Sequence, residues 1–266
     1  MRWIGPGYRF PLHDWVADGP QGVSCLEVTA EHFFDRDTRP IRQLAERYPI
    51  FVHGLGLSLG TPGPLDRVTL TQFARVADAV DATWVSEHIS FTRTSEVDLG
   101  HLNPVPRTRS SLAVMVDHAK EMADFCRRPL ILENITFDLN LPGELSEPEF
   151  LNELCDAAGC GLLLDVTNLY INAHNHNFEP LAWLHEIDPR YITQLHIVGY
   201  NRRGDRLHDS HSEPIQPDLL ELLQAVVDYA PVKAIILERD DNQLDPVAIA
   251  DEIQKLQTFA DPSPNS

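Results

Sequence analysis

The sequence predicts a (β/α)8 TIM barrel, a closed ring of eight parallel strands that alternate with helices. Its 266 residues match the length of about 250 residues that is typical of one such barrel. Eight short apolar runs alternate with stretches of helical periodicity, and no change in composition divides the chain. We therefore predict one barrel domain over residues 1–260 and a disordered C-terminal tail over residues 261–266. An open doubly wound sheet is the alternative.

Each predicted strand is a short apolar run, and the clearest is Cys160–Asp165. Its three consecutive leucines do not alternate with polar residues, as is typical of a strand that is buried on both faces of a parallel sheet. The run ends on Asp165, which we expect either to cap the following helix or to serve chemistry at a barrel mouth. The other predicted strands are residues 4–10, 23–28, 50–57, 83–88, 129–134, 192–197 and 234–238.

Helical periodicity separates these strands, with Asp66 as a predicted helix cap. The predicted helices cover residues 39–47, 66–80, 108–125, 147–157, a segment around Trp183 and Leu184, 217–229 and 246–259. Three polar segments are predicted as loops: residues 92–106, 172–177 and 200–214. A dinucleotide-binding Rossmann motif is excluded, because Gly54 and Gly56 are not followed by a third glycine at the required spacing.

The composition restricts the function. A net charge of −19 argues against nucleic acid, whose phosphates are bound by lysine and arginine. No apolar run reaches the roughly 18 residues of a membrane span, and no signal peptide is evident, so we expect a cytoplasmic protein without a membrane partner. The four cysteines show no CxxC spacing, and we predict buried free thiols at Cys25, Cys126, Cys155 and Cys160.

Polar residues with metal-binding side chains stand at the ends of seven successive predicted strands. In a (β/α) barrel these ends converge on one mouth. Imidazoles and carboxylates gathered there without counterions would be costly, and divalent cations remove that cost. Because no thiolate is present, the ligand set suits iron, zinc or manganese rather than copper(I). The seven residues are Glu27, His53, His88, Glu133, Asp165, His196 and Glu238.

Further candidates extend this set. Asp209 and His211 can present two ligating atoms from one extended segment, and Asn168 follows Asp165 by three residues. So many ligands exceed the needs of one ion, so we predict a cluster of two or three ions with Glu133 as a bridge.

Some of these residues have alternative roles. We expect Glu27 to orient a ligand or to hold Arg9, with direct ligation as the less favoured role. His53 or His88 taken alone would more often be a core histidine, and Glu238 could belong to the charged run with Arg239. The remaining loop histidines, His101, His174, His176 and His208, are predicted to face solvent or substrate.

Taken as an ordered set, these residues resemble the multinuclear non-heme iron-dependent oxidative enzymes, whose best-known member is the methanobactin-biosynthesis oxidase. The resemblance covers nearly the whole chain. It rests on short motifs at residues 53–58 (HGLGLS), 86–91 (SEHISF), 132–134 (LEN), 164–168 (LDVTN), 175–178 (NHNF), 195–196 (LH), 209–211 (DSH) and 237–240 (LERD).

The resemblance implies a barrel of the xylose-isomerase-like type that holds two or three iron ions. It also implies O2 as co-substrate, a cysteine of a ribosomally made precursor peptide as the group modified, and a separate peptide-recognition protein as partner. The implied iron ligands are His53, His88, Glu133, Asp165, Asn168, His196, Asp209, His211 and Glu238. Glu27, Asn134, His101, Asn175, His176 and Arg239 are expected to bind substrate or support the ligands.

Two positions depart from the family pattern. Thr167 stands where the family often has asparagine, and Tyr200 stands where it often has histidine. These departures leave the predicted ligands in place and bear on the choice of substrate. We expect the peptide to enter over residues 92–106 and 172–178, which follow the strands of His88 and Asp165.

Three other functions fit the sequence less well. A sugar isomerase or epimerase of the same barrel type needs fewer ligands. A trinuclear phosphodiesterase acting on abasic DNA has a similar ligand array, but the net charge of −19 and Asn168, in place of a histidine, argue against it. A metal-binding accessory protein would not need an open mouth bordered by long polar segments.

Overall fold

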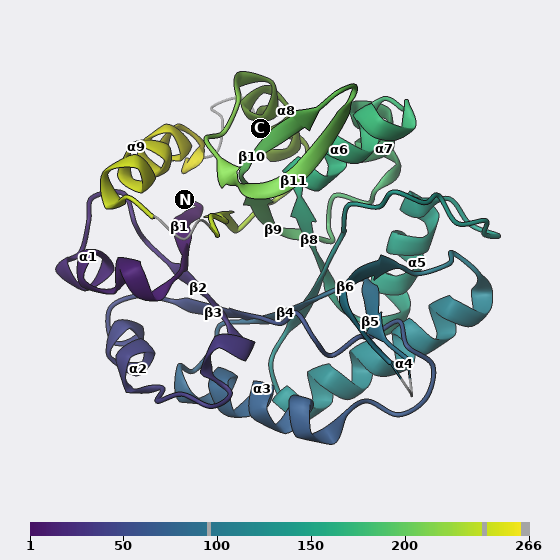
Figure 1. Cartoon of the computed structure of the whole chain (residues 1–266), viewed down its shortest axis with the longest axis horizontal. Coiled ribbons are helices and arrows are strands. Elements are labelled where there is room, and N and C mark those ends of the chain that lie inside the picture. The colour runs from purple at the N-terminus through teal and green to yellow at the C-terminus, as the bar shows by residue number, and fades with distance from the viewer. Residues whose placement is uncertain (95–96, 241–243, 262–266) are drawn as a thin grey trace.

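The computed structural model describes residues 1–94, 97–240 and 244–261, and in that part of the chain eight parallel strands close into a barrel (Figure 1). Around the barrel the strand order is β1-β12-β9-β8-β7-β4-β3-β2, and β2 pairs with β1 to complete the ring. The predicted barrel is therefore confirmed, and the open sheet is excluded. Residues 262–266 of the predicted tail lie outside the described residues.

The barrel strands are short and almost entirely buried. The three leucines of β8 have exposed fractions of 1% or less, because helices cover the outside of the sheet and other side chains fill its interior. The strands are β1 (Trp3–Tyr8), β2 (Leu26–Thr29), β3 (Ile50–His53), β4 (Val85–His88), β7 (Leu130–Glu133), β8 (Gly161–Asp165), β9 (Ile192–Ile197) and β12 (Ala234–Leu237).

Helices surround the barrel (Figure 1). Polar side chains cap several of them. Asp66 caps α3 as predicted, and Ser146 with Glu149 forms a capping box at α5. The helices are α1 (His13–Asp18), α2 (Arg39–Ala45), α3 (Arg67–Ala79), α4 (Arg109–Cys126), α5 (Glu147–Ala158), α6 (Val166–His176), α7 (Pro180–Glu186), α8 (Pro217–Tyr229) and α9 (Pro246–Leu256), with 3-10 turns η1 (Phe10–Leu12), η2 (Ala30–Phe33) and η3 (Gln257–Phe259).

Two segments that we predicted as loops contain β-hairpins instead. Segment 92–106 lies largely in the hairpin of β5 (Ser90–Arg93) and β6 (Asp98–Pro104), and segment 200–214 in that of β10 (Gly199–Arg203) and β11 (Arg206–Glu213). Both follow barrel strands, so both lie at the end of the barrel where the carboxyl termini of the strands converge. Their strands are polar on both faces, and hydrophobic alternation, the usual signal of a strand, is missing.

The predicted loop at residues 172–177 is also wrong, because most of it forms the last turns of α6. Asparagine is a poor helix former, but here tertiary contacts override its propensity. The side chain of Asn172 donates to the carbonyl of Ile135 and accepts from the amide of Phe137. Asn177, with φ of 57°, ends the helix in the left-handed conformation that asparagine tolerates.

The cysteine prediction is confirmed: Cys25, Cys126, Cys155 and Cys160 are buried and free. None of the helices in the described ranges is both long enough and apolar enough to cross a membrane.

Candidate metal centre

The barrel interior is layered, and its layer at the carboxyl ends of the strands consists of metal-binding side chains. An apolar cluster that includes Phe51, Ile131 and Leu163 lies deeper in the barrel. Residues two positions apart on a strand point to the same face. The inward-facing residue two positions further along each strand therefore lies one layer nearer the mouth. These positions hold His53, His88, Glu133, Asp165, His196 and Glu238, and all six side chains are buried.

The first donor group consists of His53, His88 and Glu133. Glu133 Oε2 lies 3.4 Å from His53 Nε2 and 3.4 Å from His88 Nε2. Two ligands about 2.1 Å from one tetrahedral ion would be roughly 3.4 Å apart. The spacing therefore fits ligands around a shared ion better than it fits hydrogen-bonded pairs.

The second nitrogen of each imidazole is already engaged. His53 Nδ1 lies 2.8 Å from Ser86 Oγ, and His88 Nδ1 lies 3.1 Å from the carbonyl oxygen of Gly54. Metal-ligating histidines commonly hold their other ring nitrogen in this way, which sets the orientation of the ring. Both Nε2 atoms are thereby directed at Glu133.

Glu133 also belongs to a second group, with Asp165, His196 and Glu238. His196 Nδ1 lies 3.4 Å from Glu133 Oε1 and 3.1 Å from Glu238 Oε2. The two oxygens of Glu133 thus face different groups, Oε2 the first and Oε1 the second. This is the arrangement that a carboxylate bridging two ions needs.

Asp165 acts both as a helix cap and as a donor. Its Oδ1 accepts a hydrogen bond of 2.7 Å from the backbone amide of Asn168. This hydrogen bond caps the first turn of α6. Its Oδ2 is buried without a hydrogen-bond partner among the described residues, as are Asn168 Oδ1 and Asp209 Oδ1. These three oxygens are candidate ligands for a further ion.

His211 in β11 closes the mouth together with three carboxylates. Its Nε2 lies 2.8 Å from Asp209 Oδ2, and its Nδ1 lies 3.2 Å from Asp240 Oδ2 and 3.7 Å from Glu238 Oε2. His211 has φ of 50°, a left-handed conformation that costs a non-glycine residue about 1–3 kcal/mol. Such strain is typical of functional positions. Here the imidazole of the strained residue faces Asp209, Glu238 and Asp240.

The donor atoms that remain free fit divalent cations. Buried polar atoms nearly always have hydrogen-bond partners, yet several at this end of the barrel have none among the residues that the structure describes. A divalent cation would bind to these nitrogen and oxygen atoms together. Because no thiolate is among them, they favour iron, manganese or zinc. The atoms are His53 Nε2, Glu133 Oε2, Asp165 Oδ2, Asn168 Oδ1, His196 Nδ1 and Asp209 Oδ1.

Without metal, protons compensate the charge of this centre. Burial alone would lower the pKa of His88, but the carboxylates of Glu133 and Glu87 raise it to about 9. Burial, together with the charges of Glu133 and Asp209, raises the pKa of Asp165 to about 8. At neutral pH the metal-free protein therefore carries protons on atoms that a metal would need.

These shifts predict a pH dependence of metal binding. Ligand atoms must lose their protons when they bind metal, so binding at pH 7 should release protons from His88 and Asp165. The apparent affinity should rise from pH 6 toward pH 9 and level off above the raised pKa of His88, about 9. Calorimetric titration of the metal-free protein in buffers of different ionisation enthalpy measures the release. An affinity that is constant from pH 6 to 9 would contradict the prediction.

A buried chain of hydrogen bonds fixes His196 from behind. Its Nε2 lies 2.7 Å from Glu27 Oε1, and Glu27 Oε2 accepts a hydrogen bond of 2.5 Å from Gln194 Nε2. Gln194 Oε1 in turn accepts one of 2.7 Å from Trp84 Nε1. Glu27 is therefore placed to orient His196, a predicted ligand, which fits the first of the roles that we expected for it. The second is wrong, because Arg9 pairs with Asp240 instead.

Other predicted site residues lie around the centre. Asn134 holds the end of β8 by bonding both the amide and the carbonyl of Asp165. Asn175 does the same for Leu207 of β11, and His176 bonds the carbonyl of Phe137. Arg239 pairs with Glu252 of α9. These contacts hold neighbouring segments of the chain in place around the centre.

Asp240 was missing from the predicted ligands, although the structure groups it with His211 and Glu238. It stands two residues beyond Glu238, so the alternation of side chains could have pointed to it. Gln194 was also missed, because an amide between apolar residues carries no ligand signal. Glu238 itself is 6% exposed, which excludes the solvated charge run.

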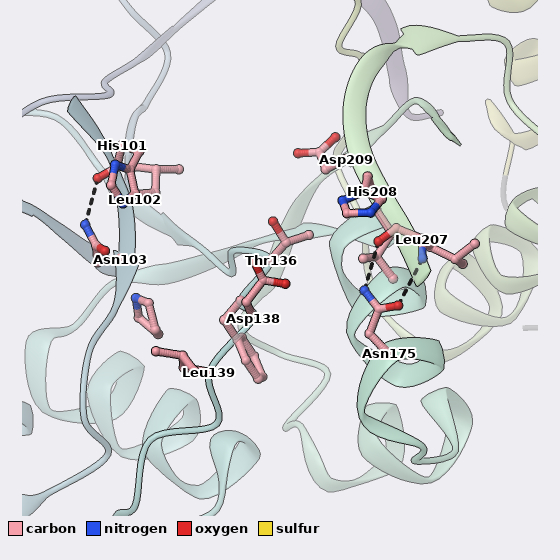
Figure 2. A pocket seen from close by; sticks show the side chains of 13 residues that line it. His101, Leu102, Asn103, Thr136, Asp138, Leu139, Asn175, Leu207, His208 and Asp209 are labelled. Atoms are coloured by element: carbon pink, nitrogen blue, oxygen red, sulfur yellow. Dashed lines mark hydrogen bonds between the residues drawn. The ribbon is translucent and has the colours of Figure 1, made fainter. Parts of the chain in front are cut away.

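A cleft of about 380 Å³ opens beside the donor groups. Figure 2 shows it between β6, with His101, Leu102 and Asn103, and β11, with Leu207, His208 and Asp209. Asp209, one of the predicted ligands, forms part of the cleft wall, so the cleft borders the centre at this residue.

Comparison with known proteins identifies relatives along the whole chain. Residues 3–261 match the family described as "RiPP precursor modification enzyme MbnB/TglH/ChrH", in which RiPP denotes a ribosomally made and then modified peptide. A UPF0276 protein of Rhizorhabdus wittichii is 33% identical over 263 residues, which are 97% of this chain and 94% of the relative. A UPF0276 protein of Acaryochloris marina is 35% identical over 240 residues, 89% of this chain and 87% of the relative.

Solved structures with the same architecture are more distant in sequence. A D-psicose 3-epimerase in the presence of D-fructose superposes with a TM-score of 0.63 at 14% identity, over 97% of this chain and 98% of that one. A xylose isomerase-like TIM barrel protein from Mycobacterium smegmatis, in complex with magnesium, gives 0.59 at 13% identity, over 94% and 86%. These likenesses confirm the xylose-isomerase-like type of barrel. The family match, together with an ordered set of motifs along the same barrel, shows that this chain belongs to the MbnB/TglH/ChrH family of RiPP precursor modification enzymes.

Proposed function

We propose that this enzyme uses iron and O2 to modify a cysteine of a ribosomally made precursor peptide, with a separate protein that recognises the peptide. The observation that carries the proposal is the position of Glu133 between two groups of buried imidazole and carboxylate donors. Membership of a family that modifies such peptides supports the class of substrate.

The residues that would hold the ions are the nine predicted ligands together with Asp240. Bound iron would supply the redox chemistry and bind the substrate thiol as thiolate. The chain supplies the environment. Glu27, Ser86 and the carbonyl of Gly54 orient the three imidazoles, and the apolar layer at Phe51 closes the barrel beneath them.

The peptide would lie in the cleft between β6 and β11, along the surface for which we predicted segments 92–106 and 172–178. His101, Asn103 and His208 line it and offer hydrogen bonds, and Leu102 and Leu139 offer apolar contact. Leu139 is 69% exposed, and covering it with a peptide would bury apolar surface. The net charge of −19 favours a neutral or basic peptide in this cleft.

Anaerobic reconstitution with ferrous iron, followed by elemental analysis, tests the cofactor. We expect more than one iron per chain, because the donors exceed the needs of one ion. Oxygen uptake is then measured with a cysteine-containing precursor peptide, with and without a candidate peptide-recognition protein, and with a serine-for-cysteine peptide as control. A single zinc with negligible iron would favour the isomerase, and oxygen uptake that is equal with the serine peptide would exclude cysteine as the group modified.

A further inference from the structure

A second cavity borders the donor residue Asp240 on the side of η1 and η2. Its volume is about 430 Å³, within the range of about 300–1,000 Å³ that is usual for small-ligand sites. Its polar lining comes from Arg9, His32, Arg36 and Asp240.

This lining is positively charged in a strongly acidic protein. The chain has 21 lysine and arginine residues against 40 aspartate and glutamate residues, yet two guanidinium groups and one carboxylate line this cavity. Burial lowers the pKa of His32, and the nearby charge of Arg9 lowers it further, so this imidazole is neutral at pH 7. Counted over the described residues that line it, the cavity thus carries one positive charge in excess.

Arg36 is available to a ligand. Its guanidinium lies over the ring of Phe10, 4.6 Å from the ring centroid, and it forms no ion pair within residues 1–94, 97–240 and 244–261. A guanidinium that lies over an aromatic ring keeps N–H donors free at its edge, and these donors match the two oxygens of a carboxylate.

Asp240 connects the cavity to the metal centre. One side of its carboxylate pairs with Arg9, and Oδ2 lies 3.2 Å from His211 Nδ1. Arg9 also donates to the carbonyl of Tyr8 over 3.0 Å, so its position is set from two sides. A group bound in the cavity would lie next to the residues that close the barrel mouth.

We propose that this cavity binds a carboxylate of the substrate peptide close to the residue that is modified, with Arg36 as its main contact. The inference rests on the proposed function for the identity of the ligand as a peptide. A single excess positive charge fits one carboxylate. A phosphate chain carries several negative charges, more than one excess positive charge balances, so the net charge of the protein would repel it. The carboxylate belongs either to the C-terminus of the peptide or to an aspartate or glutamate beside the cysteine.

Binding of three short dye-labelled probes to the iron-loaded protein tests this proposal. Gly-Gly-Cys with a free C-terminal carboxylate, the same peptide as its amide, and Gly-Asp-Cys amide are compared by fluorescence anisotropy under anaerobic conditions. One of the two carboxylate probes should bind about tenfold more tightly than Gly-Gly-Cys amide, and the probe that does so identifies the source of the carboxylate. Because no oxygen is present, the result does not depend on turnover, and a failure of the proposed oxidation would be seen separately.

The variant Arg36→Gln should abolish this preference, and Arg36→Lys should retain part of it. Arg190→Gln, which removes an exposed arginine near the opposite end of β9, should behave as the original protein. Arg36 contacts none of the donors, so the metal content of its variants should be unchanged. Equal binding of the three probes, no binding at millimolar concentration, or a preference that persists in Arg36→Gln would overturn the proposal.

Discussion

Replacing Glu133 with alanine is expected to reduce the metal content more than replacing Asp209 or His211 with alanine. Its Oε2 faces His53 and His88, and its Oε1 faces His196. Removing it takes a ligand from two groups at once, so about two ions per chain should be lost. Elemental analysis after anaerobic reconstitution measures this loss, and circular dichroism monitors the fold.

Asp209→Ala and His211→Ala provide the comparison. Both residues lie in β11 and not in the barrel wall, so each variant should lose about one ion and keep its fold. Glu221→Ala, an exposed carboxylate on α8, is the matched control and should keep all of its metal. Full metal content in the variants of Glu133, Asp209 and His211 would show that the ligand assignment is wrong.

Removing Glu27 should weaken metal binding without removing a ligand. Its carboxylate lies 2.7 Å from His196 Nε2 and leaves Nδ1 to face Glu133 and Glu238. Loss of a group that orients a metal-bound histidine typically costs about 10–100-fold in affinity. Glu27→Gln, which keeps an acceptor but not the charge, should lie near the lower end of that range, and Glu27→Ala near the upper end.

Competition with a chelator measures the affinity, and Mössbauer spectroscopy of the iron-loaded protein reports on the environment of His196. A change confined to one iron signal would distinguish orientation of one ligand from a general loss of stability. Glu221→Gln should match the original protein in both measurements. Unchanged affinity and spectra in Glu27→Ala would show that His196 is oriented by the barrel alone.

The sequence by itself predicted the barrel and the layer of donors, because both follow from local patterns. Each apolar run identifies a buried strand, and a polar residue at its end identifies the mouth. The alternation of side chains along a strand then places His53 above Phe51 and Asp165 above Leu163. Six of the predicted ligands lie in this one layer for that reason.

The segments between strands were predicted less well, because their structure depends on contacts with other parts of the chain. Helix α6 continues through its asparagines since Asn172 and Asn175 bond to residues 135, 137 and 207. The hairpin of β10 and β11 has no apolar face that would predict it, yet it delivers Asp209 and His211 to the centre.

The tertiary structure alone decided which donor faces which. Glu27 and His196 are 169 positions apart in sequence and meet within 2.7 Å because closure of the barrel brings β2 and β9 across one interior. The same closure places one oxygen of Glu133 in each of two donor groups and gives Asp240 to both Arg9 and His211. Residue types and strand ends are local properties of the sequence, whereas the direction of each lone pair depends on side-chain torsions that only the packed neighbours determine.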